Sequence, residues 1–299
     1  MTERGDSDVI LGGGAARRRL MVQEFQEHTH GPSWDYRAGS PHLAHWQLYD
    51  RLVGEVLFAL RGAGDQGLPP TVLEIGAGHG GYTEPVLAAG GRVTATEMSR
   101  PSLARLEGRF GGNESFSCSF DPDGSLEVLD DRRFSLVLCV SVLHHIPDYK
   151  TFVKRAVSRH LAAGGTFISI QDPLWYPSVS RTARRLDRLA YLSWRVTRGQ
   201  YLDGLRTQLR RIRGIYDETK AGDMVEYHVV RNGVDQEALR TMLEGAFEDV
   251  RLEKYWSTPA AILQRSGTRL RLRNTFMLVA RGNLGHGHTA TDDSSEISE

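Results

Sequence analysis

The chain has 299 residues, of which 40% are hydrophobic and 25% are charged, and its 37 basic residues equal its 37 acidic ones. This composition is typical of a globular protein with one large domain or one domain with an insertion, and the zero formal net charge argues against electrostatic steering of the whole protein to nucleic acid or to a membrane. No apolar run approaches the roughly 20 residues of a membrane span. The first residues show no signal-peptide pattern, and the only cysteines, Cys118 and Cys139, lie in apolar runs. We therefore expect a cytoplasmic protein with reduced thiols.

The first 64 residues are predicted to form a polar tail followed by a helical segment. Residues 1–14 are polar and glycine-rich, and we expect them to be disordered. Residues 15–64 contain helical patterns, the clearest over 40–60. That helix is predicted to begin with Ser40 as its N-cap and Pro41 at its first position.

The most informative stretch is residues 71–83, TVLEIGAGHGGYT. Its branched apolar residues predict a buried strand that breaks into Gly76, Gly78, Gly80 and Gly81 before a short helix. Such a turn presents backbone N–H groups to a ligand, and four glycines exceed what a tight turn alone needs. The spacing also satisfies G-x-G-x-x-G with Glu97 at the distance of a ribose-binding acid, so a nicotinamide enzyme stays open here.

Further strands follow in alternation with helices, as in a parallel α/β sheet. The sequence predicts them at 92–98, 114–120, 134–140 and 166–170. The first of these ends at Glu97, whose carboxylate is suited to accept hydrogen bonds from both ribose hydroxyls. Later strands are predicted over 249–258 and 274–282.

The spacing Glu74-x-Gly76-x-Gly78-x-Gly80 resembles motif I of the class I S-adenosyl-L-methionine-dependent methyltransferases. The stretch FSLVLCVSVLHHIPD (134–148) and the later LAAGGTFISI resemble their small-molecule members, the sugar and natural-product O-methyltransferases. The resemblance covers roughly 70–172 and 233–282. It implies a Rossmann-like α/β fold: a seven-stranded mixed sheet with its last strand antiparallel, helices on both faces, an N-terminal helical preface and a helical cap inserted after strand five. The resulting division is a tail at 1–14, the preface at 15–64, the methyltransferase domain at 65–172 and 233–282, the substrate cap at 173–232, and a disordered tail at 283–299.

The resemblance implies S-adenosyl-L-methionine as the methyl donor. Phe120 is expected against the adenine face, Asp121 near the adenine edge, and Met98 as a further apolar surface. The preface often covers this cofactor in such enzymes, which makes Tyr36, His42 and His45 candidates for the mouth of the site. The full set of expected cofactor-binding residues is Glu74, Gly76, Ala77, Gly78, Gly80, Glu97, Met98, Phe120, Asp121 and Ser141.

The resemblance also implies transfer to a hydroxyl of a small molecule, with a histidine base. An imidazole accepts a proton at neutral pH, and a carboxylate can fix its tautomer. We expect His145 as the base, Asp172 as its partner or as an acceptor ligand, and His144 as the alternative base. No metal is expected, because Ser141 stands where a metal-assisted enzyme would place an acid, and adjacent histidines are poorly spaced for zinc.

Other functions stay open at this point. C- or N-methylation on the same scaffold needs no dedicated base. A nicotinamide-dependent oxidoreductase rests on the formal glycine pattern, and a non-catalytic cofactor-binding module would need neither histidine.

An arginine-rich run lies in the expected cap, since residues 181–213 hold ten arginines, two aspartates, and neither lysine nor glutamate. In order of preference, it indicates a solvated face, a site for an anionic acceptor, or contact with an anionic membrane surface. The expected partner is a small-molecule acceptor and no nucleic acid. Whether the chain forms a homo-oligomer is left open.

Overall fold

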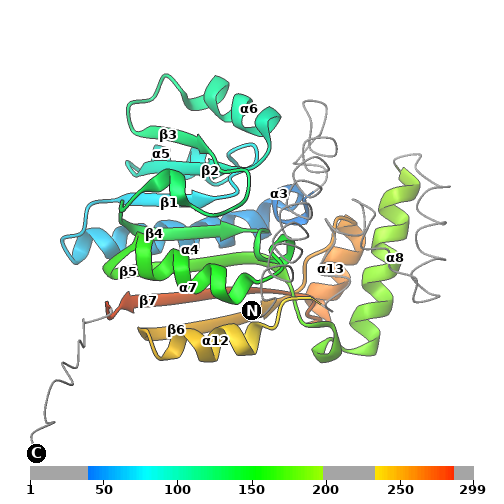
Figure 1. Cartoon of the computed structure of the whole chain (residues 1–299). Helices are drawn as coiled ribbons and strands as arrows, with labels where there is room; N and C mark the ends of the chain where they lie inside the picture. Colours follow the sequence, from blue (N-terminus) through cyan, green and yellow to red (C-terminus); the bar gives the residue numbers. More distant parts are fainter. Residues whose placement is uncertain (1–39, 198–232, 286–299) are drawn as a thin grey trace, which may run out of the picture.

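The computed structural model describes residues 40–197 and 233–285, and its centre is a seven-stranded sheet (Figure 1). The strand order is β3-β2-β1-β4-β5-β7-β6. The first five strands in the chain are parallel, and β7 lies antiparallel between β5 and β6. The predicted fold class, with its antiparallel last strand, is confirmed. The strands are β1 Thr71–Ile75, β2 Arg92–Glu97, β3 Phe116–Phe120, β4 Phe134–Val140, β5 Leu161–Pro173, β6 Phe247–Tyr255 and β7 Thr275–Asn283.

Helices cover both faces of the sheet. Apolar residues of α4, α5 and α6 pack on one face, and those of α7 and α12 pack on the other. Figure 1 shows α7 and α12 in front of the sheet and α4 behind it. The helices are α3 Pro41–Ala44, α4 Trp46–Asp65, α5 Thr83–Ala88, α6 Arg100–Phe110, α7 Tyr149–His160, α8 Arg181–Thr197, α12 Gln236–Glu244 and α13 Ala261–Arg269, with single 3₁₀ turns η1 Glu127–Leu129, η2 Leu143–His145 and η3 Tyr176–Ser178.

The start of the helical preface differs from the prediction. The helix predicted over 40–60 is broken at His45, which has extended backbone angles and whose Nε2 lies 2.7 Å from the Thr258 carbonyl oxygen. Ser40 is the N-cap residue, as predicted, but its hydroxyl makes no capping hydrogen bond. Helix α12 has a side-chain N-cap, since the Asp235 carboxylate accepts from the Ala238 N–H. The described part of the preface therefore consists of two helices separated by His45, which contacts the loop after β6.

The fifth strand is longer than predicted and carries a β-bulge. Ile170 pairs with Met277 while Asp172 pairs with the adjacent Phe276, so Gln171 is the extra residue. Its φ of 69° lies in the left-handed region, which is uncommon for a side chain other than glycine. A bulge at a strand end redirects the side chains that follow it, and this one lies where the catalytic aspartate was expected.

Several predictions fall on residues that the structure does not describe. These are the tail at 1–14, the helical pattern over 15–39, the cap beyond α8 at 198–232, and residues 286–299 of the predicted tail at 283–299. The first residue of that tail, Asn283, is instead the buried last residue of β7. In the described part of the cap, α8 is helical, as expected. Within the described ranges, no helix is both long and apolar enough to cross a bilayer. Cys118 and Cys139 are both free thiols.

Candidate active site

The residues predicted to bind the cofactor and the acceptor gather at one edge of the sheet. Parallel strands β1 to β5 all end there, and the strand order reverses between β1 and β4. In α/β folds, ligands bind at this switch point beyond the carboxyl ends of the strands. The glycine-rich turn follows β1, Glu97 ends β2, Phe120 ends β3, Ser141 follows β4, and Asp172 lies near the end of β5.

The glycine-rich turn has the backbone geometry that the sequence predicts. Gly76, Gly78 and Gly80 have φ values of 66°, 57° and 78°, which L-residues with a Cβ rarely adopt. A Cβ added at Gly76 would lie 2.8 Å from Cγ2 of Val142, and one at Gly80 would run into the Phe110 ring. Packing thus provides a reason for Gly76 and Gly80 that is separate from any ligand.

Glu97 holds the turn against the end of β2. Its Oε2 accepts from the Gly78 N–H at 2.8 Å, and its Oε1 accepts from the N–H groups of Met98 and Ser99 at 2.9 and 3.0 Å. The carboxyl group is buried, and burial raises its pKa although the three donors oppose this. Glu97 therefore organises the backbone of the turn; its predicted contact with ribose stays a prediction.

Glu74 lies buried beneath the turn. Its carboxylate accepts from the Thr83 hydroxyl at 2.5 Å, so it ties β1 to the first residue of α5. Burial, aided by the negative charge of Glu97, raises the pKa of Glu74 to about 7, while the Thr83 hydrogen bond acts in the opposite direction. Thr83 was not predicted to contribute to the site. The signal available in the sequence was a threonine nine residues after an acid that lies inside an apolar strand.

The end of β3 presents Phe120 and Asp121, as predicted for the adenine pocket. Phe120 is half-buried, and the Arg100 guanidinium carbon lies 4.0 Å from its ring centroid. Asp121 is buried, accepts from the Leu126 N–H at 3.2 Å, and has its pKa raised by burial to about 6. Met98 is half-buried beside Glu97. These positions suit an adenine pocket, and their role stays a prediction.

Asp172, near the end of β5, contacts His144 rather than the expected His145. Oδ1 of Asp172 lies 2.8 Å from Nδ1 of His144 and accepts from the His144 backbone N–H at 3.0 Å, while Oδ2 accepts from the Ser169 hydroxyl at 2.9 Å. The side chain of Asp172 is 0% exposed and that of His144 is 11% exposed. The His145 ring lies beside that of His144, with centroids 3.9 Å apart. We call this arrangement of His144, Asp172 and Ser169 the histidine–aspartate cluster.

The bulge at Gln171 explains how Asp172 reaches this cluster. Ile168 and Ile170 pack on the α4 face of the sheet, whereas Phe167 and Leu174 pack on the α7 face. If side chains alternated regularly along β5, Asp172 would lie on the α4 face together with Ile170. Because the bulge adds one residue, Asp172 instead falls on the side of Ser169. Gln171 turns to the other face, where it bonds the hydroxyls of Tyr255 and Ser257 at 3.1 and 2.7 Å.

The preface lies against the glycine-rich turn. The Tyr49 hydroxyl donates to the Gly81 carbonyl oxygen at 2.7 Å. His42 is buried with its ring centroid 6.0 Å from that of Tyr82, and burial lowers its pKa to about 3, so it stays neutral. Of the three residues expected at the mouth, His42 is thus a buried ring, His45 bonds the loop after β6, and Tyr36 lies outside the described residues.

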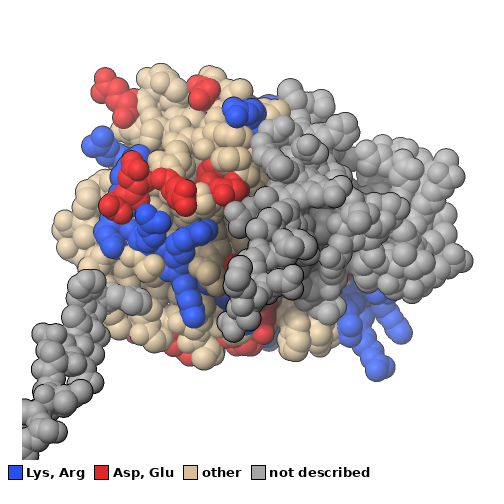
Figure 2. Space-filling model, in the orientation of Figure 1, with Lys and Arg blue, Asp and Glu red and all other residues tan. Residues whose placement is uncertain are grey.

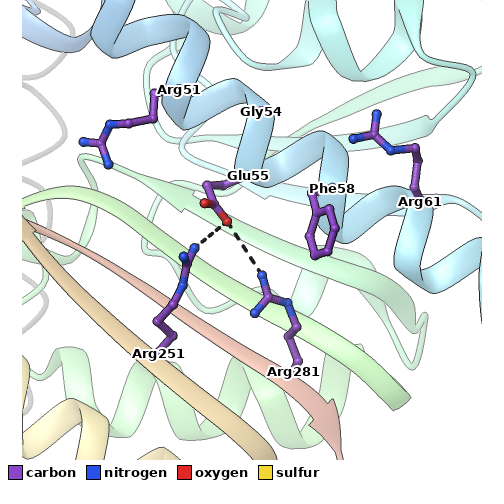
Figure 3. A pocket seen from close by; sticks show the side chains of 7 residues that line it. All are labelled: Arg51, Gly54, Glu55, Phe58, Arg61, Arg251 and Arg281. Atoms are coloured by element: carbon purple, nitrogen blue, oxygen red, sulfur yellow. Dashed lines mark ion pairs between the residues drawn. The ribbon is translucent and has the colours of Figure 1, made fainter.

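A shallow depression lies away from this edge, between α4 and strands β6 and β7 (Figure 3). The Glu55 carboxylate lies between the guanidinium groups of Arg251 and Arg281 and pairs with both. We interpret the depression as an ion-pair cluster that joins α4 to the sheet. Within the ranges that the structure describes, no three His, Cys, Asp or Glu side chains converge as metal ligands, and the predicted metal-independent transfer stays a prediction.

The sheet order, the antiparallel β7 and a glycine-rich turn held by an acid at the end of β2 define the class I methyltransferase fold. Residues 73–167 match the family model described as a methyltransferase domain. The predicted class is therefore confirmed for this segment, which includes the last three residues of β1, all of β2 to β4 and the first half of β5.

Individual relatives agree with this class over short segments. The chain is 33% identical over 100 residues to a ubiquinone biosynthesis O-methyltransferase from Idiomarina loihiensis, covering 31% of this chain and 39% of that protein. It is 42% identical over 84 residues to ribosomal RNA small subunit methyltransferase A from Zymomonas mobilis, covering 27% of each. The chain thus spans well under half of the length of either curated relative.

A solved structure agrees over the whole fold. The N-methyltransferase NodS from Bradyrhizobium japonicum WM9, in complex with S-adenosyl-L-homocysteine, is similar with a TM-score of 0.50 and 16% identity. The likeness covers 87% of this chain and 98% of that one, and it concerns the fold alone.

Proposed function

We propose that this protein transfers a methyl group from S-adenosyl-L-methionine to a small-molecule acceptor. The observation that carries the proposal is the glycine-rich turn held by Glu97 at the same sheet edge as the histidine–aspartate cluster. The matched methyltransferase domain supports it, and NodS was crystallised with the demethylated form of this cofactor. We expect the reaction to take place in the cytoplasm.

The residues at the turn are suited to this cofactor. S-adenosyl-L-methionine supplies a methyl group that is bonded to a cationic sulfur and is already activated. In our proposal the backbone of 76–80 lies against the cofactor without intervening side chains, Glu97 keeps that backbone in place and faces the ribose, and Ser141 lines the site beyond β4. Phe120 and Asp121 form the adenine end. Ser141 has a φ of 59° and donates its N–H to the Ile170 carbonyl oxygen at 2.7 Å, which fixes the loop that leads to the histidines.

For the base we propose His144, with Asp172 as the residue that positions it. An ionised carboxylate only accepts hydrogen bonds, so Nδ1 of His144 must carry the proton in this contact. Nε2 is then the unprotonated ring nitrogen, which can take the proton of an acceptor hydroxyl while its oxygen receives the methyl group. His145, which the sequence favoured, is the alternative base, and Asp172 would then act on it only through His144.

The acceptor is proposed to lie between this edge and the cap, and a hydroxyl of a sugar or other natural product fits a histidine base. C- or N-methylation is the second candidate, because NodS is an N-methyltransferase on the same fold and such a transfer needs no base. Whether the acceptor is anionic is a separate question. The exposed arginines of α8 point away from the packed side of that helix, so we do not assign them to the acceptor.

The test is a pair of titrations by calorimetry, one with S-adenosyl-L-methionine and one with NADH. We expect saturable binding of the first and none of the second. Saturable NADH binding without S-adenosyl-L-methionine binding would overturn the proposal in favour of an oxidoreductase. Transfer of a labelled methyl group to a panel of hydroxylated and amine acceptors then separates the two candidates.

A further inference from the structure

One end of the molecule, formed by α8 and α13, is strongly basic. The fold brings α8 with its arginine run into contact with α13, and the segment 259–274 that contains α13 has no acid. Figure 2 shows basic side chains standing out at the lower end of α8. The exposed arginines of the two segments are Arg181, Arg184, Arg185, Arg188, Arg265, Arg269, Arg271 and Arg273. In a chain whose formal net charge is zero, this concentration is a marked asymmetry.

The acid in this part of α8 does not neutralise the exposed face. Asp187 accepts from the Asn274 side chain at 2.9 Å, and burial raises its pKa. It lies on the packed side of α8 together with the buried Ala183 and Ala190, whereas the arginines occupy the opposite side of the helical wheel. Among the described residues, no ion pair within 4.0 Å joins the eight arginines to an acid.

Large apolar side chains are exposed at the same end. Ile262 is 81% exposed, Leu270 is 64% exposed and Leu189 is 55% exposed, and Leu192 of α8 is partly exposed as well. The other exposed large apolar residues are distributed over different parts of the chain. Exposed apolar groups among cations are the combination that proteins bound to lipid surfaces display.

We propose that the α8–α13 end is a docking surface for an anionic lipid membrane. The arginines would bind lipid phosphates through paired N–H groups, and Ile262, Leu270 and Leu189 would enter the boundary between headgroups and acyl chains. Nucleic acid would match the charge, but its phosphate backbone offers no apolar layer for several aliphatic side chains to enter together. A single small acceptor would not require eight arginines on two segments. The proposal is independent of methyl transfer, since it concerns only where the protein resides.

The experiment is sedimentation of the full chain with vesicles of phosphatidylcholine, with and without phosphatidylglycerol, over a range of salt concentrations. We expect binding to the anionic vesicles, weakening as salt rises, and none to phosphatidylcholine alone. Arg184→Ala with Arg188→Ala should lower the partition coefficient about 25-fold, because each arginine near such a surface contributes about fivefold. Ile262→Ser should lower it about tenfold at high salt, where the apolar contribution remains.

The matched control is Arg61→Ala with Arg92→Ala, which removes two exposed arginines elsewhere and should change the partition coefficient less than about twofold. Circular dichroism and S-adenosyl-L-methionine binding report that each variant is folded. The proposal is overturned if the anionic vesicles do not bind, if phosphatidylcholine alone binds equally well, or if the control pair weakens binding as much as the α8 pair. Tighter binding to a single-stranded oligonucleotide than to the vesicles would overturn it in favour of nucleic acid.

Discussion

Replacing Asp172 by Asn removes the negative charge that lies 2.8 Å from the His144 ring and keeps the size of the side chain. The asparagine oxygen can still accept from both N–H groups of His144, and its amide can donate to the Ser169 hydroxyl, so the contacts are retained without their charge. A hydrogen bond to a charged group is worth about 1 to 1.5 kcal/mol more than a neutral one. If His144 acquires a positive charge as it takes the proton, kcat should fall about five- to fifteenfold.

Removal of the imidazole itself should cost more. His144→Ala should lower kcat by about 10²- to 10⁴-fold, the usual range for losing general-base help. Because Asp172 acts through His144, the double variant should be no slower than His144→Ala alone. Single-turnover transfer of labelled methyl at saturating cofactor measures the rate, and calorimetry should give cofactor affinities within about twofold of the wild type, because the cluster lies outside the turn.

His145→Ala is the control within the same loop, and three results would count against the reasoning. If His145→Ala is the more damaging variant, the base is the neighbour that the sequence favoured. If the double variant is slower than the wild type by the product of the two single effects, Asp172 does not act through His144. If both histidine variants keep near wild-type rates, no histidine base exists and C- or N-methylation becomes the better hypothesis.

Three further predictions concern the turn, the buried acid beneath it and the ion-pair cluster. Glu97→Ala should weaken S-adenosyl-L-methionine binding by roughly one to three orders of magnitude by calorimetry, since the turn loses a buried charged acceptor; unchanged affinity in a folded variant would refute the role. Because the pKa of Glu74 rises from 4.5 to about 7, the folded protein retains a proton that the unfolded chain releases, and the free energy of unfolding should fall as pH rises between these values. Glu74→Gln should remove this slope and stabilise the protein by about 3 kcal/mol at pH 8 in urea titrations. Glu55→Ala leaves Arg251 and Arg281 without their shared carboxylate and should lower the free energy of unfolding by about 1 kcal/mol, a loss that high salt should diminish.

The order of strands and the place of the site follow from local features of the sequence. The apolar run at 134–140 by itself predicts a buried strand, and the glycines after Ile75 predict the turn that ends β1. Right-handed crossovers between the parallel strands then bring the strand ends to one edge of the sheet. The strand that begins at Leu161 was predicted too short, because Gly164 and Gly165 suggest a turn, whereas the pairing of Phe134 with Leu161 carries the strand back to α7. Contacts between distant segments, such as His45 with Thr258, have no local signal and were missed.

Which histidine contacts Asp172 depends on one residue, Gln171, whose amino-acid type does not indicate a β-bulge. Had β5 kept its alternation, Asp172 would lie with Ile170 on the α4 face, away from Ser169. A glycine at position 171 would have indicated a bulge, but a glutamine reads as an ordinary strand residue, and its φ of 69° is maintained by side-chain bonds to Tyr255 and Ser257 on β6 and the loop that follows. The antiparallel end of the sheet therefore does more than complete the fold, since through Gln171 it sets the face on which the aspartate meets His144. Sequence reasoning could place an acid and two histidines at one edge, and only the pairing of β5 with β7 decides which of them touch.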